Sequence, residues 1–274
     1  MTQQLPADAP IGVFDSGVGG LTVLRALLDQ MPHERFIYLG DTARLPYGTK
    51  SAATVVRYAL QAAEHFRRET VKCLVVACNT AASVGLDPLR ERFAPLPVIG
   101  VIEPGAQAAC SASASGRIAV IATERTVREG AYQASILRLR PQAQVSVRAA
   151  PLLVAVAEEG LGTGAIAQLA AHHYLDGLFH GASPPDTLLL GCTHFPMLAG
   201  AIRAAVPQGT GIVDSAVTTA RAVEKELTRL RLVRQGGAGD VRFFATDGAE
   251  RFARIGSHFL ERPITPAGVG IIDL

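Results

Sequence analysis

Two stretches of this chain share one pattern, an apolar strand-like run followed by a cysteine and then by polar residues. The first spans residues 74–80 (LVVACNT), and the second spans residues 188–194 (LLLGCTH). Short, continuous apolar runs that lead into a helix are typical of buried parallel strands. The repeat therefore indicates two similar α/β units, with Cys78 and Cys192 at matching positions.

Short β-branched runs alternate with longer stretches of helical period along the chain. Such alternation predicts an α/β fold in which parallel sheets are covered by helices on both faces. We expect strands at residues 11–15, 36–40, 73–77, 98–101, 118–122, 144–148, 187–191, 211–214 and 241–245. The expected helices include residues 20–30, 51–69, 81–93, 104–111, 126–138, 164–181, 196–205 and 215–231. The partner of the strand at 241–245 stays open.

Polar or thiol side chains lie where several of the expected strands end, namely at Asp15, Cys78, Thr123 and Cys192. Ligands of open α/β sheets bind outside the carboxyl ends of the strands. Two such sheets facing each other would therefore place these side chains around one cleft. One sulfur on each side of a cleft is the arrangement needed to move a proton from one face of a carbon to the other.

The overall composition argues against several classes of protein. The formal charge is +2 without a basic block, so nucleic acid and an anionic membrane surface are not indicated as partners. No apolar run approaches the ~20 residues that span a bilayer, and residues 1–10 lack the pattern of a signal peptide. We therefore expect a cytoplasmic protein with reduced thiols. No CxxC or HExxH motif occurs, so no metal site is expected.

The glycine-rich turn at residues 15–20 (DSGVGG) allows three interpretations. Its glycines let backbone N–H groups approach an anionic ligand at the start of a helix. A dinucleotide site is a weaker interpretation, because the G-x-G-x-x-G register from Gly17 requires a glycine where Thr22 stands. A purely structural turn is the third interpretation, but it leaves the acidic Asp15 at the strand end unexplained.

The cysteines divide into two pairs. Cys73 and Cys110 fall inside an expected strand and an expected helix, and such cysteines are usually inert core residues. Cys78 and Cys192 instead follow a strand and precede a helix. A helix N-terminus favours the thiolate, so we expect a lowered pKa and a catalytic role for both.

The polar residues beside the two cysteines have a structural and a functional interpretation. Asn79, Thr80 and Thr193 can cap a helix, and the same side chains can hold a carboxylate. His194 can be a satisfied core histidine, but its place two residues after Cys192 favours a proton partner.

Two further segments are candidates for the site. Glu158 is either solvated at a helix end or part of the site, and the sequence leaves this open. Residues Pro46, Tyr47 and Gly48 form a turn on any interpretation, and their backbone amides can meet an anionic substrate tail.

Four segments together resemble the glutamate racemases, within the cofactor-independent aspartate/glutamate racemase family. They are residues 15–23 (DSGVGGLTV), 46–48 (PYG), 77–81 (ACNTA) and 191–196 (GCTHFP). The resemblance extends from about residue 11 to the end of the helix after residue 215. It implies two α/β domains related by a pseudo-twofold axis, with residues 1–102 plus 215–274 in the first domain and residues 103–214 in the second.

The resemblance also implies an activity and roles for individual residues. The activity is interconversion of L- and D-glutamate without pyridoxal phosphate or metal, which supplies D-glutamate for peptidoglycan. The implied catalytic residues are Cys78, Cys192, Asp15, His194 and Glu158, with Cys78 acting on D-glutamate and Cys192 on L-glutamate. The implied substrate-binding residues are Asp15, Ser16, Pro46, Tyr47, Gly48, Asn79, Thr80, Thr123, Thr193 and His194.

The chain departs from the family pattern at one point, where Ala122 stands in place of an expected glycine and charged Glu124 and Arg125 follow Thr123. The sequence does not say how this pair affects the contacts of Thr123. It also leaves a homodimer open. Alternative functions are an aspartate racemase, a two-lobed amino-acid-binding protein and, less well supported, a cysteine hydrolase.

Overall fold

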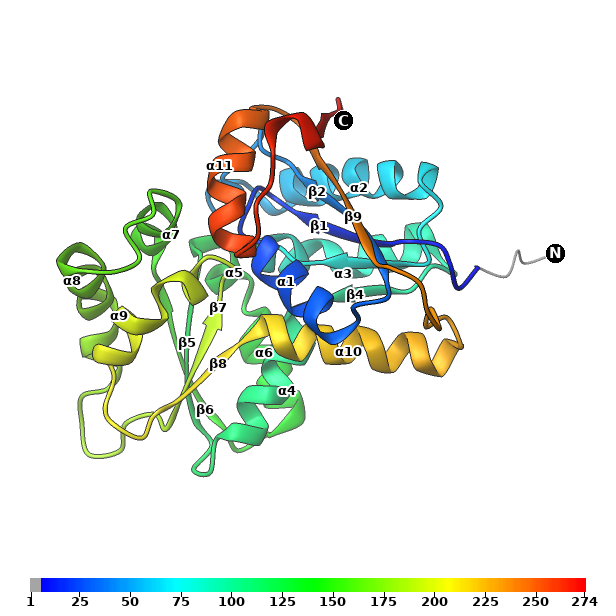
Figure 1. Ribbon diagram of the computed structural model, residues 1–274. Helices are drawn as coiled ribbons and strands as arrows, with labels where there is room; N and C mark the ends of the chain where they lie inside the picture. Colours follow the sequence, from blue (N-terminus) through cyan, green and yellow to red (C-terminus); the bar gives the residue numbers. More distant parts are fainter. Residues whose placement is uncertain (1–5) are drawn as a thin grey trace.

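The computed structural model describes residues 6–274, which form two parallel β-sheets with helices packed around them (Figure 1). The larger sheet has six strands in the order β10-β9-β2-β1-β3-β4, and the smaller has four in the order β6-β5-β7-β8. Every pair of neighbouring strands is parallel. The predicted fold class is therefore confirmed. Residues 1–10 were compared with a signal peptide, and the first five of them lie outside the described residues.

Every expected strand is present, and its ends differ from the prediction by one residue at most. The strands are β1 (Ile11–Asp15), β2 (Arg35–Gly40), β3 (Cys73–Val76), β4 (Val98–Gly100), β5 (Arg117–Ala122), β6 (Gln144–Ala149), β7 (Thr187–Gly191), β8 (Gly211–Asp214), β9 (Asp240–Ala245) and β10 (Val269–Ile271).

The α-helices lie between these strands in sequence. They are α1 (Leu21–Gln30), α2 (Ala52–Arg68), α3 (Asn79–Phe93), α4 (Ile102–Ala112), α5 (Glu124–Glu129), α6 (Ala131–Leu139), α7 (Pro151–Glu158), α8 (Ala165–Leu175), α9 (Ala199–Ala204), α10 (Ser215–Leu230) and α11 (Ala249–Leu260). Short 3-10 helices are η1 (Tyr47–Thr49), η2 (Asp176–Leu178), η3 (Phe195–Leu198) and η4 (Pro266–Gly268). None of the helices described is long and apolar enough to cross a membrane.

Strands β1, β3 and β7 are buried along their whole length, and β5 is buried from Ile118 onward, because helices cover both faces of the sheets. In the larger sheet β1 and β3 pair from Ile11 beside Cys73 to Phe14 beside Val76. In the smaller sheet β5 and β7 pair from Ile118 beside Thr187 onward. Cys73 lies fully inside this core, as its interpretation as an inert residue predicts. These buried strands fix the positions of the loops that follow them.

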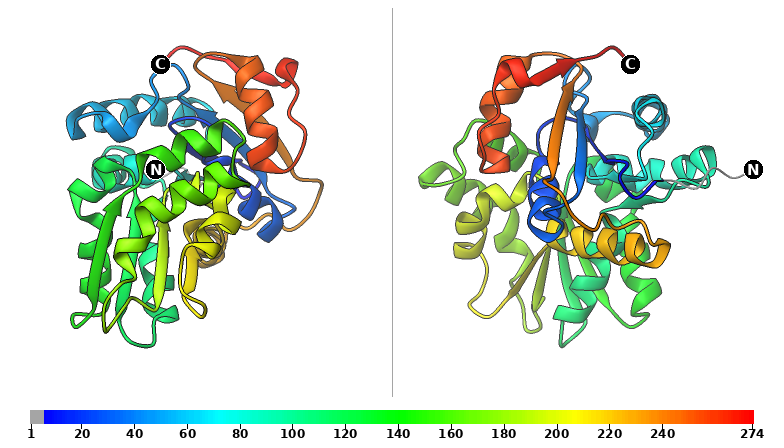
Figure 2. Two further views of the ribbon diagram at one scale, coloured as in Figure 1. Left: turned by 90° about the vertical axis from the view of Figure 1, so that its left-hand side faces the viewer. Right: turned by 45° about the vertical axis from the view of Figure 1, so that its right-hand side comes forward.

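The C-terminal segment returns to the larger sheet, which answers the open question about residues 241–245. Strand β9 pairs with β2 in parallel, and β10 extends the sheet beyond it. Helix α11 packs against α1. In both views of Figure 2 the red C-terminal part lies together with the blue N-terminal part, above the green second sheet. Neither α11 nor β10 is among the elements predicted from the sequence.

The prediction of one continuous helix at residues 126–138 is wrong, because the segment forms two helices, α5 and α6. Gly130 adopts a left-handed conformation with φ of +65° and ends α5 before α6 begins. A glycine adopts this conformation at little cost. Tyr132, near the start of α6, is buried.

We propose that the two sheets mark two domains, residues 1–102 plus 215–274 and residues 103–214. The proposal rests on strand membership, since β5 to β8 form one sheet and the remaining strands form the other. The chain passes between them at α4 and again at the start of α10, and these two helices pack against each other.

Candidate active site

One cleft between the two sheets collects almost all the residues selected from the sequence. It is lined by Ser16, Gly17, Leu45, Pro46, Tyr47, Gly48, Cys78, Asn79, Thr80, Thr123, Val154, Glu158, Cys192, Thr193 and His194. Of the predicted site residues, only Asp15 is absent from this lining. The two cysteines reach the cleft from different sheets, since Cys78 follows β3 and Cys192 follows β7.

Cys78 is the N-cap of α3, so the cysteine itself and not Asn79 or Thr80 caps this helix. Its sulfur accepts a hydrogen bond from Ala81 N at 3.4 Å and donates to Ser16 Oγ at 3.5 Å. The expected lowering of its pKa is nevertheless wrong. Burial, reinforced by the negative charge of Asp15, raises the pKa of Cys78 to about 12. At neutral pH Cys78 is therefore a thiol and a potential proton donor.

Asp15 lies behind the cleft wall, next to Cys78. Its Oδ2 accepts a hydrogen bond from Gly17 N at 2.9 Å, while Oδ1 is buried and has no hydrogen-bond partner among the described residues. Burial raises the pKa of Asp15 above its usual value, although the nearby positive charge of His194 opposes this. Asp15 is thus placed to influence the Cys78 thiol rather than to form the cleft surface.

The second cysteine has different polar partners. His194 Nδ1 lies 3.7 Å from Cys192 Sγ, and His194 Nε2 lies 3.1 Å from Glu158 Oε1. Burial disfavours the charged imidazole, but hydrogen bonds with Cys192 and Glu158 outweigh it and raise the pKa of His194 to about 10. The same contact lowers the pKa of Glu158. The two sulfurs therefore have different neighbours, since Cys192 lies beside the His194 imidazole and Cys78 lies near the Asp15 carboxylate.

Asn79 is positioned by a residue that the sequence analysis missed. Tyr132 donates a hydrogen bond from its hydroxyl to Asn79 Oδ1 at 2.6 Å. Asn79 Nδ2 is buried and has no partner among the residues that the structure describes. Because Oδ1 is held by Tyr132, the amide nitrogen is left free to donate to a ligand in the cleft. No local motif marks Tyr132, which belongs to α6, a helix between two strands of the smaller sheet.

A cluster of threonine hydroxyls joins the two halves beside Gly48. Thr123 Oγ1 lies 2.9 Å from Thr80 Oγ1 and 3.0 Å from Thr126 Oγ1. Arg125 donates from Nε to Lys50 O at 2.8 Å, which ties α5 to the end of η1. Arg125 therefore holds the neighbouring turn in place, and Thr123 lines the cleft.

Tyr47 contributes to the cleft mainly through its position in the turn. Its ring is buried, and its hydroxyl donates to Asp41 Oδ2. Asp41 also accepts from Arg44 Nε at 2.7 Å. With its hydroxyl engaged by Asp41, Tyr47 does not offer that group to a ligand in the cleft.

Close packing explains the glycines in the turn after β1. A methyl group on Gly19 would lie 2.4 Å from Thr193 Oγ1, and one on Gly20 would lie 2.6 Å from Asp15 Cβ. Thr22 Oγ1 adds a hydrogen bond to Thr193 O at 3.1 Å. The turn is therefore packed directly against the Cys192 loop, and these contacts account for Gly19 and Gly20 without a bound nucleotide.

Comparisons with known proteins agree with this geometry. The sequence pattern of the Asp/Glu/hydantoin racemases matches residues 11–223. A glutamate racemase from Geobacter metallireducens is 46% identical over 251 residues, covering 91% of this chain and 92% of that protein. The crystal structure of glutamate racemase isoform RacE1 from Bacillus anthracis has a TM-score of 0.92 at 36% identity and covers 97% of this chain and 98% of that one. The chain therefore belongs to the Asp/Glu/hydantoin racemase family.

Proposed function

We propose that this chain is a glutamate racemase that interconverts L- and D-glutamate, with Cys78 and Cys192 as its two acid–base groups. The observation that carries the proposal is the pair of buried cysteines at one cleft, one from each sheet. The glutamate racemase from Francisella tularensis supports the choice of substrate. That structure is described as a complex with D-glutamate, at 33% identity and a TM-score of 0.90 over 97% of this chain and 98% of that one.

The unequal surroundings of the two sulfurs suggest how a turnover proceeds. In the direction from L- to D-glutamate, the Cys192 thiolate takes the α-proton and becomes a thiol. The Cys78 thiol gives its proton to the opposite face of the carbanion and becomes a thiolate. The bond to the α-proton breaks on one face while a new C–H bond forms on the other. Each turnover leaves the pair in the reverse protonation state, ready for the reverse reaction.

Several donors are placed to stabilise the negative charge that develops on the substrate. Asn79 Nδ2 is free to donate, and the hydroxyls of Thr80 and Thr193 line the same cleft. The N-terminus of α3 adds the positive end of a helix dipole. Donors held rigidly in a site from which water is excluded stabilise an enolate-like carboxylate most effectively.

We propose that the reaction needs no pyridoxal phosphate. In enzymes that depend on pyridoxal phosphate, a lysine holds the cofactor through a Schiff base. None of the residues that line the cleft is a lysine. His194, with its thiol and carboxylate partners, supplies instead the charge that a thiolate base requires.

We further propose that the D-glutamate serves peptidoglycan synthesis in the cytoplasm. A relative from Escherichia coli supports this role. Its structure is described as a complex with L-glutamate and the activator UDP-MurNAc-Ala, at 31% identity and a TM-score of 0.74 over 91% of this chain and 95% of that one. Assembly into a homodimer stays a prediction, which sedimentation of the purified protein would decide.

The purified protein should racemise L-glutamate at least about tenfold more efficiently, in kcat/KM, than L-aspartate. One methylene of difference in a fitted site is worth about 1–3 kcal/mol, or roughly 10- to 200-fold. Circular dichroism of each amino acid over time measures both rates. A preference for aspartate would contradict the proposal and favour an aspartate racemase. A double variant in which alanine replaces both cysteines supplies the background rate.

A further inference from the structure

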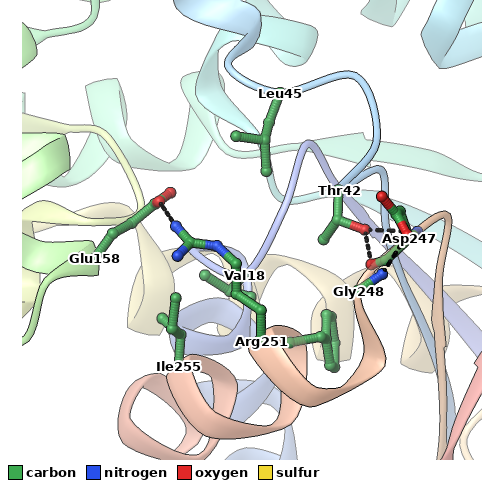
Figure 3. Close-up of a pocket in the computed structure, with 9 residues that line it drawn as sticks. Val18, Thr42, Leu45, Glu158, Asp247, Gly248, Arg251 and Ile255 are labelled. Atoms are coloured by element: carbon green, nitrogen blue, oxygen red, sulfur yellow. Dashed lines mark hydrogen bonds and ion pairs between the residues drawn. The ribbon is translucent and has the colours of Figure 1, made fainter.

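Helix α11, in the C-terminal segment of the larger sheet, contributes Arg251 to a pocket that adjoins the cleft and shares Leu45 and Glu158 with it. Arg251 Nη2 donates to Glu158 Oε2 at 2.9 Å. Glu158 comes from α7, which follows β6 of the smaller sheet. Figure 3 shows the Arg251 side chain extending from α11 to the Glu158 carboxylate. The ion pair therefore connects the two halves of the molecule at the edge of the cleft.

The contact continues inward to a sulfur. Glu158 Oε1 lies 3.1 Å from His194 Nε2, and His194 Nδ1 lies 3.7 Å from Cys192 Sγ. The two carboxylate oxygens of Glu158 thus have different partners. Arg251 contacts Oε2, and His194 contacts Oε1. Residues from both halves form one chain of polar contacts that leads from α11 to the Cys192 sulfur.

Exposure indicates what Arg251 adds to this chain. The side chain of Arg251 is 51% exposed, while that of Glu158 is 17% exposed. A glutamate at a cleft mouth gains hydration by turning its carboxylate outward. The guanidinium of Arg251 lies on the solvent side and neutralises that carboxylate in place. Without it, Glu158 is free to leave His194 for water.

Helix α11 supports the same histidine at a second point. The ring of Phe259 contacts the ring of His194 edge-on, with centroids 5.3 Å apart. Val18 and Ile255 line the same pocket as Arg251 (Figure 3). Cys78 has different partners, since its sulfur forms hydrogen bonds with Ser16 Oγ and Ala81 N. The support from α11 is therefore directed to one of the two cysteines.

We propose that Arg251 is a positioning residue for the Cys192 half of the reaction, acting through Glu158 and His194. The inference rests on the proposed racemase function. It assigns the C-terminal helix a part in proton transfer at the L-glutamate side, and it requires the two halves to be together for that transfer.

Kinetic isotope effects can separate the two cysteines, whereas kcat/KM alone cannot. Because enantiomers have equal free energy, kcat/KM must be the same in both directions for every variant. The α-deuteron of L-glutamate moves in the step at Cys192, while the α-deuteron of D-glutamate moves in the step at Cys78. Slowing only the Cys192 step therefore raises the isotope effect for L-glutamate and lowers it for D-glutamate.

The test compares Arg251→Met, which keeps the apolar stem, with Arg251→Lys, which keeps a charge, and with Arg251→Gln as a second neutral variant. Arg254→Met is the matched control, because Arg254 is an exposed arginine on the same helix. We expect Arg251→Met to lower kcat/KM about three- to tenfold, as for a partly exposed ion pair. Its isotope effect should rise for α-deuterated L-glutamate and fall for the D-enantiomer. Arg251→Lys should partly restore kcat/KM and the wild-type isotope effects. Arg254→Met should match the wild type in both measurements.

The inference is overturned if both neutral variants keep wild-type isotope effects, or if the effects for the two enantiomers change together. Either result would make Arg251 a merely structural contact. The proposed function fails separately, because a wild-type protein that does not racemise glutamate would end the comparison before any variant is measured. A melting temperature within about 4 °C of the control shows that the variant is folded at the assay temperature.

Discussion

Replacing Cys78 with alanine should lower kcat/KM for glutamate racemisation by at least about a thousandfold in both directions, and replacing Cys192 should do the same. Each change removes the proton donor or acceptor on one face of the α-carbon, and a positioned acid–base group contributes about 10²–10⁴ in rate. Both sulfurs are buried at the cleft, so water does not easily take their place. Time-resolved circular dichroism of L- and D-glutamate measures the loss.

The other cysteines provide a matched control. Cys110 lies in α4, and its thiol faces Ile136 O at 3.9 Å, outside the cleft. Alanine at position 110 should therefore leave kcat/KM near the wild-type value. The double variant lacking Cys78 and Cys192 should be hardly slower than either single variant, because the two groups act as a unit. Full activity in Cys192→Ala would refute the mechanism with two thiols.

Replacing Lys72 with methionine should cost about 3–5 kcal/mol of the free energy of unfolding, because it leaves a buried charge without its partner. Lys72 and Glu34 are both fully buried, and Lys72 Nζ lies 2.5 Å from Glu34 Oε2. The same ammonium donates to Ala7 O at 2.5 Å and to Leu232 O at 2.8 Å. It thus joins the start of the chain to the segment that follows α10 and leads back to the larger sheet.

Urea unfolding of the wild type and the variant measures this cost. Adding Glu34→Gln to Lys72→Met should recover part of the stability, since the uncompensated carboxylate is then gone. The folded fraction of Lys72→Met should racemise glutamate normally, because Lys72 is not among the residues that line the cleft. A loss below about 1 kcal/mol would mean that the ion pair is dispensable to the fold.

Much of the fold is predictable from the sequence because its central strands are continuous apolar runs between turn residues. Every strand that borders the cleft could be placed in this way. The elements missed are those with weak local signals. Strand β10 spans only Val269–Ile271, and α11 depends on packing against α1, which is distant in sequence. The break at Gly130 was missed because a single glycine inside a helical pattern is often tolerated.

The residues of the proposed site also divide into those with a local sequence signal and those that only tertiary packing places. The strand ends and the family motifs pointed to most of the residues that line the cleft, including both cysteines, but not to the apolar Leu45 and Val154. Tyr132 and Arg251 carry no motif, and only the tertiary arrangement brings them into contact with Asn79 and Glu158 of the cleft. The expected thiolate character of Cys78 failed for the same reason. The helix N-terminus is a local feature, whereas the burial and the Asp15 charge that raise its pKa arise from packing.

Conversion of L-glutamate in deuterated water, followed by mass spectrometry of the separated enantiomers, tests the central claim most directly. If Cys192 removes the proton and Cys78 returns one from the solvent, the D-glutamate formed early carries deuterium at its α-carbon. The L-glutamate recovered at the same time then keeps its original proton. Formation of D-glutamate that retains the original proton, or equal labelling of both enantiomers from the start, would contradict transfer between two opposed cysteines.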